Sequence, residues 1–174
     1  KCPSSMKNLL ITPDEINELA RPCSADEDIA RRFIEEAEHN DIRPALGDAL
    51  YIAIATSPDK YDELLNGGLY SDPCGEQRYF PGLKKALAYY AYARIVKSGT
   101  NISTRYGFVS KSDDYSRSVE FKERNQAYND AFSIADHYMK DCLGYIQCRP
   151  EAFPEYIQDG KMTANRVRYK VIGD

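Results

Sequence analysis

Apolar residues recur at helical spacing in the first part of the chain, between residues that begin and end helices. Thr12 is followed by Pro13 and by Glu15, which together form a capping box with proline at the first helical position. A helix is therefore predicted to begin here and to run to about Arg21, where Pro22 ends it.

A second helix is predicted to begin at the capping residues 24–27 and to run to about His39. Its apolar residues form a stripe on one face, consisting of Ile29, Ala30, Phe33, Ile34 and Ala37. Glu35, Glu36 and Glu38 lie mostly off this stripe, so we interpret them as a solvated face.

Proline and glycine divide the next part of the chain. Pro44 is predicted to open a third helix, and residues 57–59 (SPD) a short fourth helix that ends at Gly67. Residues 69–82 contain Pro73, Gly75 and Pro81 between aromatic residues, which predicts an ordered loop or a small hairpin.

Two long helices are predicted in the remainder. Residues 83–97 are apolar or aromatic nearly all round, as in the central helix of a bundle. Residues 101–112 fit an irregular loop or a short hairpin that turns near Gly107. Residues 113–146 keep apolar steps of three and four, and one helix of that length would extend about 50 Å, beyond a compact domain of this size. It must break within residues 117–125 or pack against a neighbouring molecule.

The C-terminal residues 147–174 form an extension of different character. Polar and apolar residues alternate over residues 166–172 (RVRYKVI), as in an edge strand. A lone strand is not stable, so this one is expected to pair with the hairpin of residues 101–112 or with another chain. The fold class is therefore predicted to be mainly α: a helical bundle with a long helix in its C-terminal half and a small β element.

Length and composition favour one soluble globular domain, with a helical core over residues 6–146. No apolar run approaches the ~20 residues needed to cross a bilayer, so no membrane partner is expected. Residues 1–5 precede Met6 and are interpreted as an upstream or non-native remnant. The net charge is −4, and the first 87 residues carry ten basic and sixteen acidic side chains. The negative charge is therefore concentrated in the N-terminal half.

The sequence offers little catalytic or metal-binding chemistry. It lacks the common phosphate-loop, dinucleotide, zinc-protease and nucleophile-elbow motifs, and we expect no cofactor and no metal. Glu36 and His39 share a helical face, but a di-iron site needs a second such pair. Asp136 and His137 are adjacent and point in different directions. Cys142 lies on the apolar stripe of its helix and is interpreted as a buried, inert thiol.

Two small groups of basic and aromatic residues remain as candidates for binding a partner. They are Arg105, Tyr106 and Phe108 in the predicted hairpin, and Arg166, Arg168 and Lys170 in the C-terminal strand. A protein contact is the preferred interpretation. Two alternatives stay open: a helical nucleic-acid-binding regulator that uses these basic residues, and a small enzyme with Glu36 and His39, or Cys74, in an unrecognised site.

Several segments, taken in order, resemble tailed-phage head-tail connector (adaptor) proteins. The opening of these proteins is similar to residues 9–16 (LLITPDEI) and to the acidic second helix, residues 27–38 (EDIARRFIEEAE). A related, uncharacterised family from phages and prophages of gut bacteria resembles the chain further. That resemblance extends to residues 46–51 (LGDALY), 82–94 (GLKKALAYYAYAR), 104–109 (TRYGFV) and 112–116 (SDDYS).

The resemblance implies a non-catalytic, mainly helical structural subunit that forms a ring, commonly of twelve copies, between the portal and the tail. Its expected partners are other copies of itself, the portal protein and a tail or stopper protein, with DNA only as passing cargo. Its expected location is the virion, and the bacterial cytoplasm during assembly. On this interpretation Glu35, Glu36 and Glu38 would line a DNA channel, where negative charge repels phosphate.

Overall fold

The computed structural model describes residues 9–23, 25–98, 101–104, 107–110 and 121–156. The first two helices are α1 (Pro13–Leu19) and α2 (Glu27–Ala37). The predicted capping box of α1 is confirmed, because Thr12 accepts a hydrogen bond from the Glu15 amide and Glu15 accepts one from the Thr12 amide. Asp26 is the N-cap of α2, and its side chain accepts from the Asp28 amide.

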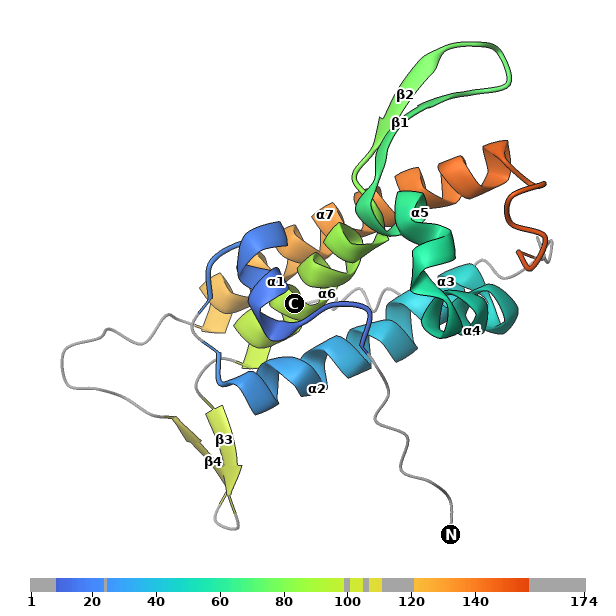
Figure 1. Ribbon diagram of the computed structural model, residues 1–174. Helices are drawn as coiled ribbons and strands as arrows, with labels where there is room; N and C mark the ends of the chain where they lie inside the picture. Colours follow the sequence, from blue (N-terminus) through green and yellow to red (C-terminus); the bar gives the residue numbers. More distant parts are fainter. Residues whose placement is uncertain (1–8, 24, 99–100, 105–106, 111–120, 157–174) are drawn as a thin grey trace, which may run out of the picture.

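The prediction of a separate third helix beginning at Pro44 is wrong. A π-helical turn (η1, Glu38–Ile42) joins α2 directly to α3 (Arg43–Leu46), as Figure 1 shows. The buried residues of this turn are Glu38 and Ile42, which follow the buried Ala37 of α2, so the wider turn keeps Ile42 in the core. It also relieves the clash that a proline makes with the preceding turn of an ordinary α-helix.

Gly47 ends α3 with a positive φ of 80°, and α4 (Asp48–Thr56) begins immediately after it. A short 3-10 turn (η2, Pro58–Tyr61) and α5 (Asp62–Asn66) follow, and Gly67 caps α5 as expected. Residues 68–80 then form a hairpin of β1 (Gly68–Ser71) and β2 (Gln77–Phe80), with Leu69 opposite Tyr79. The hairpin alternative for this stretch is therefore confirmed.

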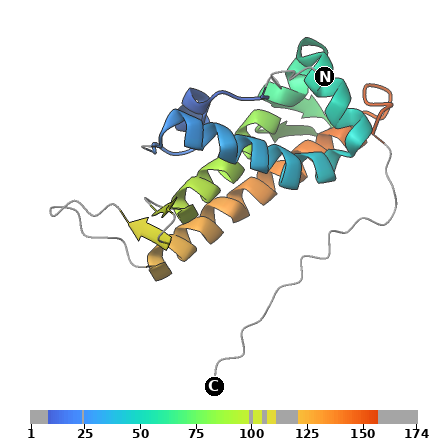
Figure 2. The same ribbon diagram turned by 90° about the horizontal axis from the view of Figure 1, so that it is seen from below.

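Helix α6 (Leu83–Ser98) is the centre of the molecule, as its all-round apolar pattern predicted. It lies between α2 on one side and α7 (Phe121–Cys148) on the other, and α1 packs against its side (Figures 1 and 2). Alanine predominates among its buried residues, which allows the neighbouring helices to approach closely: Leu83, Ala86, Leu87, Ala88, Tyr90, Ala91 and Ala93.

The long helix in the C-terminal half is confirmed. Helix α7 has 28 residues, or about 42 Å, and it runs without a break through Asn125. Its C-terminal half does not extend free into solvent, because it packs against β2 and holds the side chains of Cys142, Tyr145 and Ile146 in the core. Residues 113–120 of the predicted helix lie outside the described part.

The second predicted hairpin is also confirmed, as β3 (Asn101–Thr104) and β4 (Gly107–Ser110) pair antiparallel. The sequence analysis placed the end of the core at residue 146, but buried residues continue beyond it. Phe153, which the sequence analysis placed in the extension, is 5% exposed and contacts the rings of Tyr61 and Tyr145. The predicted strand of residues 166–172 lies outside the described residues.

Candidate interaction surface

The β1–β2 hairpin extends away from the helices, as Figure 1 shows, and its base is held by two glycines. Gly67 and Gly82 both have positive φ, 77° and 89°, and their backbones cross closely. A Cβ on Gly82 would lie 2.5 Å from the carbonyl carbon of Asn66, and a Cβ on Gly67 would lie 2.5 Å from the amide nitrogen of Gly82. No other residue type fits this crossing, so it fixes where the hairpin leaves the body.

The inner face of the hairpin is anchored by an aromatic cluster. Phe80 stacks on Tyr145 of α7 with ring centroids 4.2 Å apart, and Tyr70 meets both rings edge to face at 5.7 and 5.2 Å. Arrangements of this kind stabilise beyond the area that they bury. The hairpin is therefore packed rigidly against α7.

The tip of the hairpin is ordered by one carboxylate. Asp72 accepts hydrogen bonds from the amides of Cys74 and Glu76 and from the guanidinium of Arg78. Burial raises the pKa of Asp72, but the two amides and Arg78 outweigh it and hold the pKa below its ordinary value. Such a turn holds one conformation before any partner is bound.

The outer face of the hairpin, which we define as Leu69 and Tyr79, is apolar and open to solvent. The two side chains are 72% and 64% exposed and lie directly opposite each other across the strands. Since Asp72 and Glu76 form a hydrogen-bonded pair, alternation makes Leu69 and Tyr79 a non-hydrogen-bonded pair, whose side chains lie close together. An ordered arm that exposes a large apolar pair is typical of a protein interaction site.

Sequence reasoning predicted the hairpin but did not select these two residues. The usable signal was the alternation in residues 68–71 and 77–80 around the turn-forming residues 72–75 (DPCG), which places Leu69 and Tyr79 on the same face. The sequence does not show which face of the hairpin is exposed, because the other face is buried by Tyr145, a residue of α7 that packs on Tyr70 and Phe80.

Most of the residues predicted to bind a partner lie outside the described part of the chain. These are Arg105, Tyr106, Arg166, Arg168 and Lys170. Phe108 lies on β4, of which the structure describes the backbone pairing. The structure therefore does not test whether these residues form a common binding surface, and their role stays a prediction.

The interpretation of the three glutamates as one solvated face is wrong for Glu38. Glu35 and Glu36 are exposed, whereas Glu38 is 3% exposed and cannot line a channel. Its Oε1 accepts from the Leu10 amide at 2.8 Å, and its Oε2 accepts from the Tyr51 hydroxyl at 2.9 Å. The physical reason is its position four residues after the buried Ile34, which points it inward.

A second buried carboxylate lies on the same π-helical turn. Asp41, with a side chain that is 5% exposed, forms an ion pair at 2.6 Å with Arg94 of α6. Arg94 also lies 3.9 Å from Glu36 and donates to the Tyr90 carbonyl. The turn is thereby tied to the central helix by charge as well as by packing.

The candidate enzyme residues each contact other parts of the core. His39 packs beside the ring of Tyr51, at a centroid distance of 6.5 Å, while Glu36 points toward Arg94. Asp136 accepts a hydrogen bond from the Tyr90 hydroxyl, and the adjacent His137 contacts the Ser133 carbonyl instead. In the described part of the chain, no group of three His, Cys, Asp or Glu side chains could hold a metal ion.

The thiol of Cys142 is fully buried, as predicted, and Cys74 is exposed on the hairpin. Burial, with a further contribution from Asp141, raises the pKa of Cys142 to about 12. At pH 8, iodoacetamide should therefore alkylate Cys74 within minutes and leave Cys142 unmodified until guanidinium unfolds the protein, as peptide mass spectrometry will show. Equal labelling rates for the two thiols would contradict this packing.

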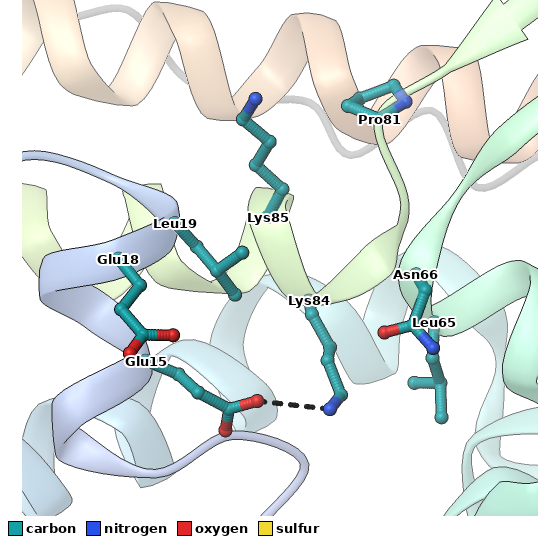
Figure 3. A pocket seen from close by; sticks show the side chains of 8 residues that line it. All are labelled: Glu15, Glu18, Leu19, Leu65, Asn66, Pro81, Lys84 and Lys85. Atoms are coloured by element: carbon teal, nitrogen blue, oxygen red, sulfur yellow. Dashed lines mark hydrogen bonds and ion pairs between the residues drawn. The ribbon is translucent and has the colours of Figure 1, made fainter.

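Figure 3 shows a shallow notch between α1, α5 and the start of α6. Lys84 lies across it from Glu15, and the two form an ion pair at 3.1 Å. Burial raises the pKa of Glu15, but hydrogen bonds from the Thr12 amide and from Lys84 outweigh this and lower it. The pair joins α1 to α6, and we interpret the notch as a structural contact.

Within the residues that the structure describes, no helix is both long and apolar enough to span a membrane. Comparison with known proteins gives no match to a curated protein and none to a solved structure. One family model, described as a family of unknown function (DUF6712), matches residues 42–166. The matched region contains the β1–β2 hairpin, both long helices and the segment that follows α7. Because the match spans well over half of the 174 residues, the chain belongs to the DUF6712 family.

Proposed function

We propose that this protein is a structural, non-catalytic subunit of a phage or prophage head-tail connector. Copies of it assemble into a ring between the portal protein and a tail or stopper protein, in the bacterial cytoplasm during assembly and then in the virion. The observation that carries the proposal is the outer face of the β1–β2 hairpin, Leu69 and Tyr79, which is ordered, apolar and exposed.

A ring of identical subunits needs two different surfaces on each copy, because the contact is head to tail. The hairpin supplies one exposed apolar surface. Ile52 of α4, which is 60% exposed, belongs to a different element and provides an apolar position on a second surface. These two positions lie on different elements, which is consistent with a head-to-tail contact.

The exposed charge on α2 supports a role around DNA. Glu35 and Glu36 face solvent on a helix that also exposes Glu27 and Asp28, and these four carboxylates outnumber the two exposed arginines of the helix, Arg31 and Arg32. A channel lined by carboxylates repels phosphate, so that DNA passes as cargo without binding. We assign Glu35 and Glu36, and no longer Glu38, to such a lining.

The assembly role of the outer face is tested by the double substitution Leu69→Ser and Tyr79→Ser. We expect the native chain to form rings when the portal protein of its phage is added, and the double variant to remain monomeric in light scattering. The hairpin itself should stay folded, because its anchor is the inner face with Phe80 and Tyr145.

The matched control is Gln77→Ser, which alters a polar, exposed residue on the same side of the hairpin. It should assemble as the native chain does. Circular dichroism establishes that all three proteins have the same helical content. Normal rings from the double variant, or a native chain that never assembles with its portal, would overturn the proposal.

A further inference from the structure

The β1–β2 hairpin has an unpaired edge. Within the described residues it is a two-stranded sheet, in which β2 packs on α7 and β1 pairs with β2 alone. Alternation of the ladder turns the backbone N–H and C=O groups of Leu69 and Ser71 outward on β1. Such an edge pairs readily with another strand, and proteins commonly cover it.

The segment that follows α7 shares one aromatic contact with the hairpin. Phe153 packs on Tyr145 at 5.6 Å, and Tyr70 of β1 packs on the same ring at 5.2 Å. Tyr156, the last described residue, donates its amide to the Phe153 carbonyl. Residues 157–165 reach up to about 30 Å when extended, which is ample to bring the following segment alongside β1.

The sequence of residues 166–172 fits both faces that β1 offers. Val167, Tyr169 and Val171 share one side of the predicted strand, and Arg166, Arg168 and Lys170 share the other. If the segment pairs with β1 so that its apolar side chains lie beside Leu69, they extend the outer face of the hairpin. The basic side chains then lie on the opposite face of the sheet, which carries Tyr70.

That second face has a negative neighbour. Burial is the largest cause of the raised pKa of Tyr70; Arg78, which lies opposite Tyr70 on β2 and is paired with Asp72, lowers this pKa, and Asp141 of α7 raises it. Asp141 is exposed and forms no ion pair with the described residues. One register therefore continues the apolar row on one side and turns the basic side chains to the side where Asp141 lies.

We propose that residues 166–172 of this chain add as a third strand to the free edge of β1 in the same molecule. The added strand pairs with the outward groups of Leu69 and Ser71, extends the apolar outer face beside Leu69 and places its basic side chains toward Asp141. The inference concerns the single chain and does not depend on ring assembly.

Hydrogen exchange of the full chain, followed by mass spectrometry, tests it. The double variant Arg168→Pro and Tyr169→Pro removes the amide hydrogens of two adjacent residues, so one of them is a ladder donor whichever edge the segment uses. The control, Met162→Pro and Thr163→Pro, places the same disruption before the segment. We expect the outward amides of β1 to exchange at least tenfold faster in the first variant than in the native chain or the control.

Each other result overturns the inference. Equal exchange in all three proteins shows that β1 is not paired with the segment. Protection lost from β3 and β4 rather than from β1 shows that the segment binds the second hairpin. Protection that rises with protein concentration, together with a dimer in light scattering, shows pairing between molecules. Exchange in α6 should be the same throughout, which confirms that the core stays folded.

Discussion

Replacing Gly82 by alanine should lower the free energy of unfolding by about 3 kcal/mol or more. The added methyl would lie 2.5 Å from the carbonyl carbon of Asn66 and 2.6 Å from the amide of Gly67, both backbone atoms that cannot rotate away. Overpacking of this kind costs about 1–3 kcal/mol, and positive φ at a residue with a side chain adds about 1–3 kcal/mol. The midpoint of thermal unfolding should fall by about 10 °C, as followed by circular dichroism.

The control for this substitution is Gly47→Ala. Gly47 has nearly the same φ, 80°, but an added Cβ there would meet nothing within 4 Å. Gly47→Ala should therefore show the cost of backbone strain alone, about 1–3 kcal/mol. Equal destabilisation by the two substitutions would mean that the backbones do not cross closely at the base of the hairpin.

Replacing Arg94 by methionine should be comparably severe, with a loss of about 3–5 kcal/mol in the free energy of unfolding. The substitution keeps most of the side-chain volume but removes the guanidinium that neutralises Asp41, whose side chain is 5% exposed. A buried carboxylate that loses its counter-charge is costly because it has also lost its hydration. Urea denaturation of the variant and of the native chain gives the difference directly.

Arg43→Met is the matched comparison. Arg43 binds both oxygens of Asp48, but their side chains are 45% and 65% exposed, so water replaces the lost contact and the expected cost is below about 1 kcal/mol. Adding Asp41→Asn to Arg94→Met should restore part of the lost stability. A cost for Arg94→Met no greater than that for Arg43→Met would show that burial around Asp41 is not important.

Local pattern was sufficient to predict most of the helices and both hairpins. The capping box at Thr12, the glycine after α5 and the all-round apolar character of residues 83–97 each act within a few residues of the element that they define. The same holds for Cys142, whose place on an apolar stripe predicts its burial.

The features that the sequence did not reveal depend on contacts between distant segments. Pro44 was expected to open a helix, but a π-helical turn absorbs it inside a continuous one. Glu38 was assigned to solvent, whereas the Leu10 amide and the Tyr51 hydroxyl make its burial possible. The sequence likewise gave no sign that Gly67 and Gly82 would meet.

The candidate site shows the same division. The strands and the turn of the β1–β2 hairpin follow from alternation and from residues 72–75, so its existence was predictable. Which of its faces is free depends on Tyr145, more than sixty residues further along the chain. The exposure of Leu69 and Tyr79 therefore depends on tertiary contacts. The sequence analysis selected basic residues elsewhere in the chain as partner-binding candidates and did not identify this apolar pair.

Electron microscopy of the native protein, alone and mixed with the portal protein of its phage, addresses the connector function most directly. We predict closed rings of this chain on the portal, with the β1–β2 hairpin of each subunit in contact with the next copy. A chain that stays monomeric at every concentration, with the portal present as well as absent, would contradict it.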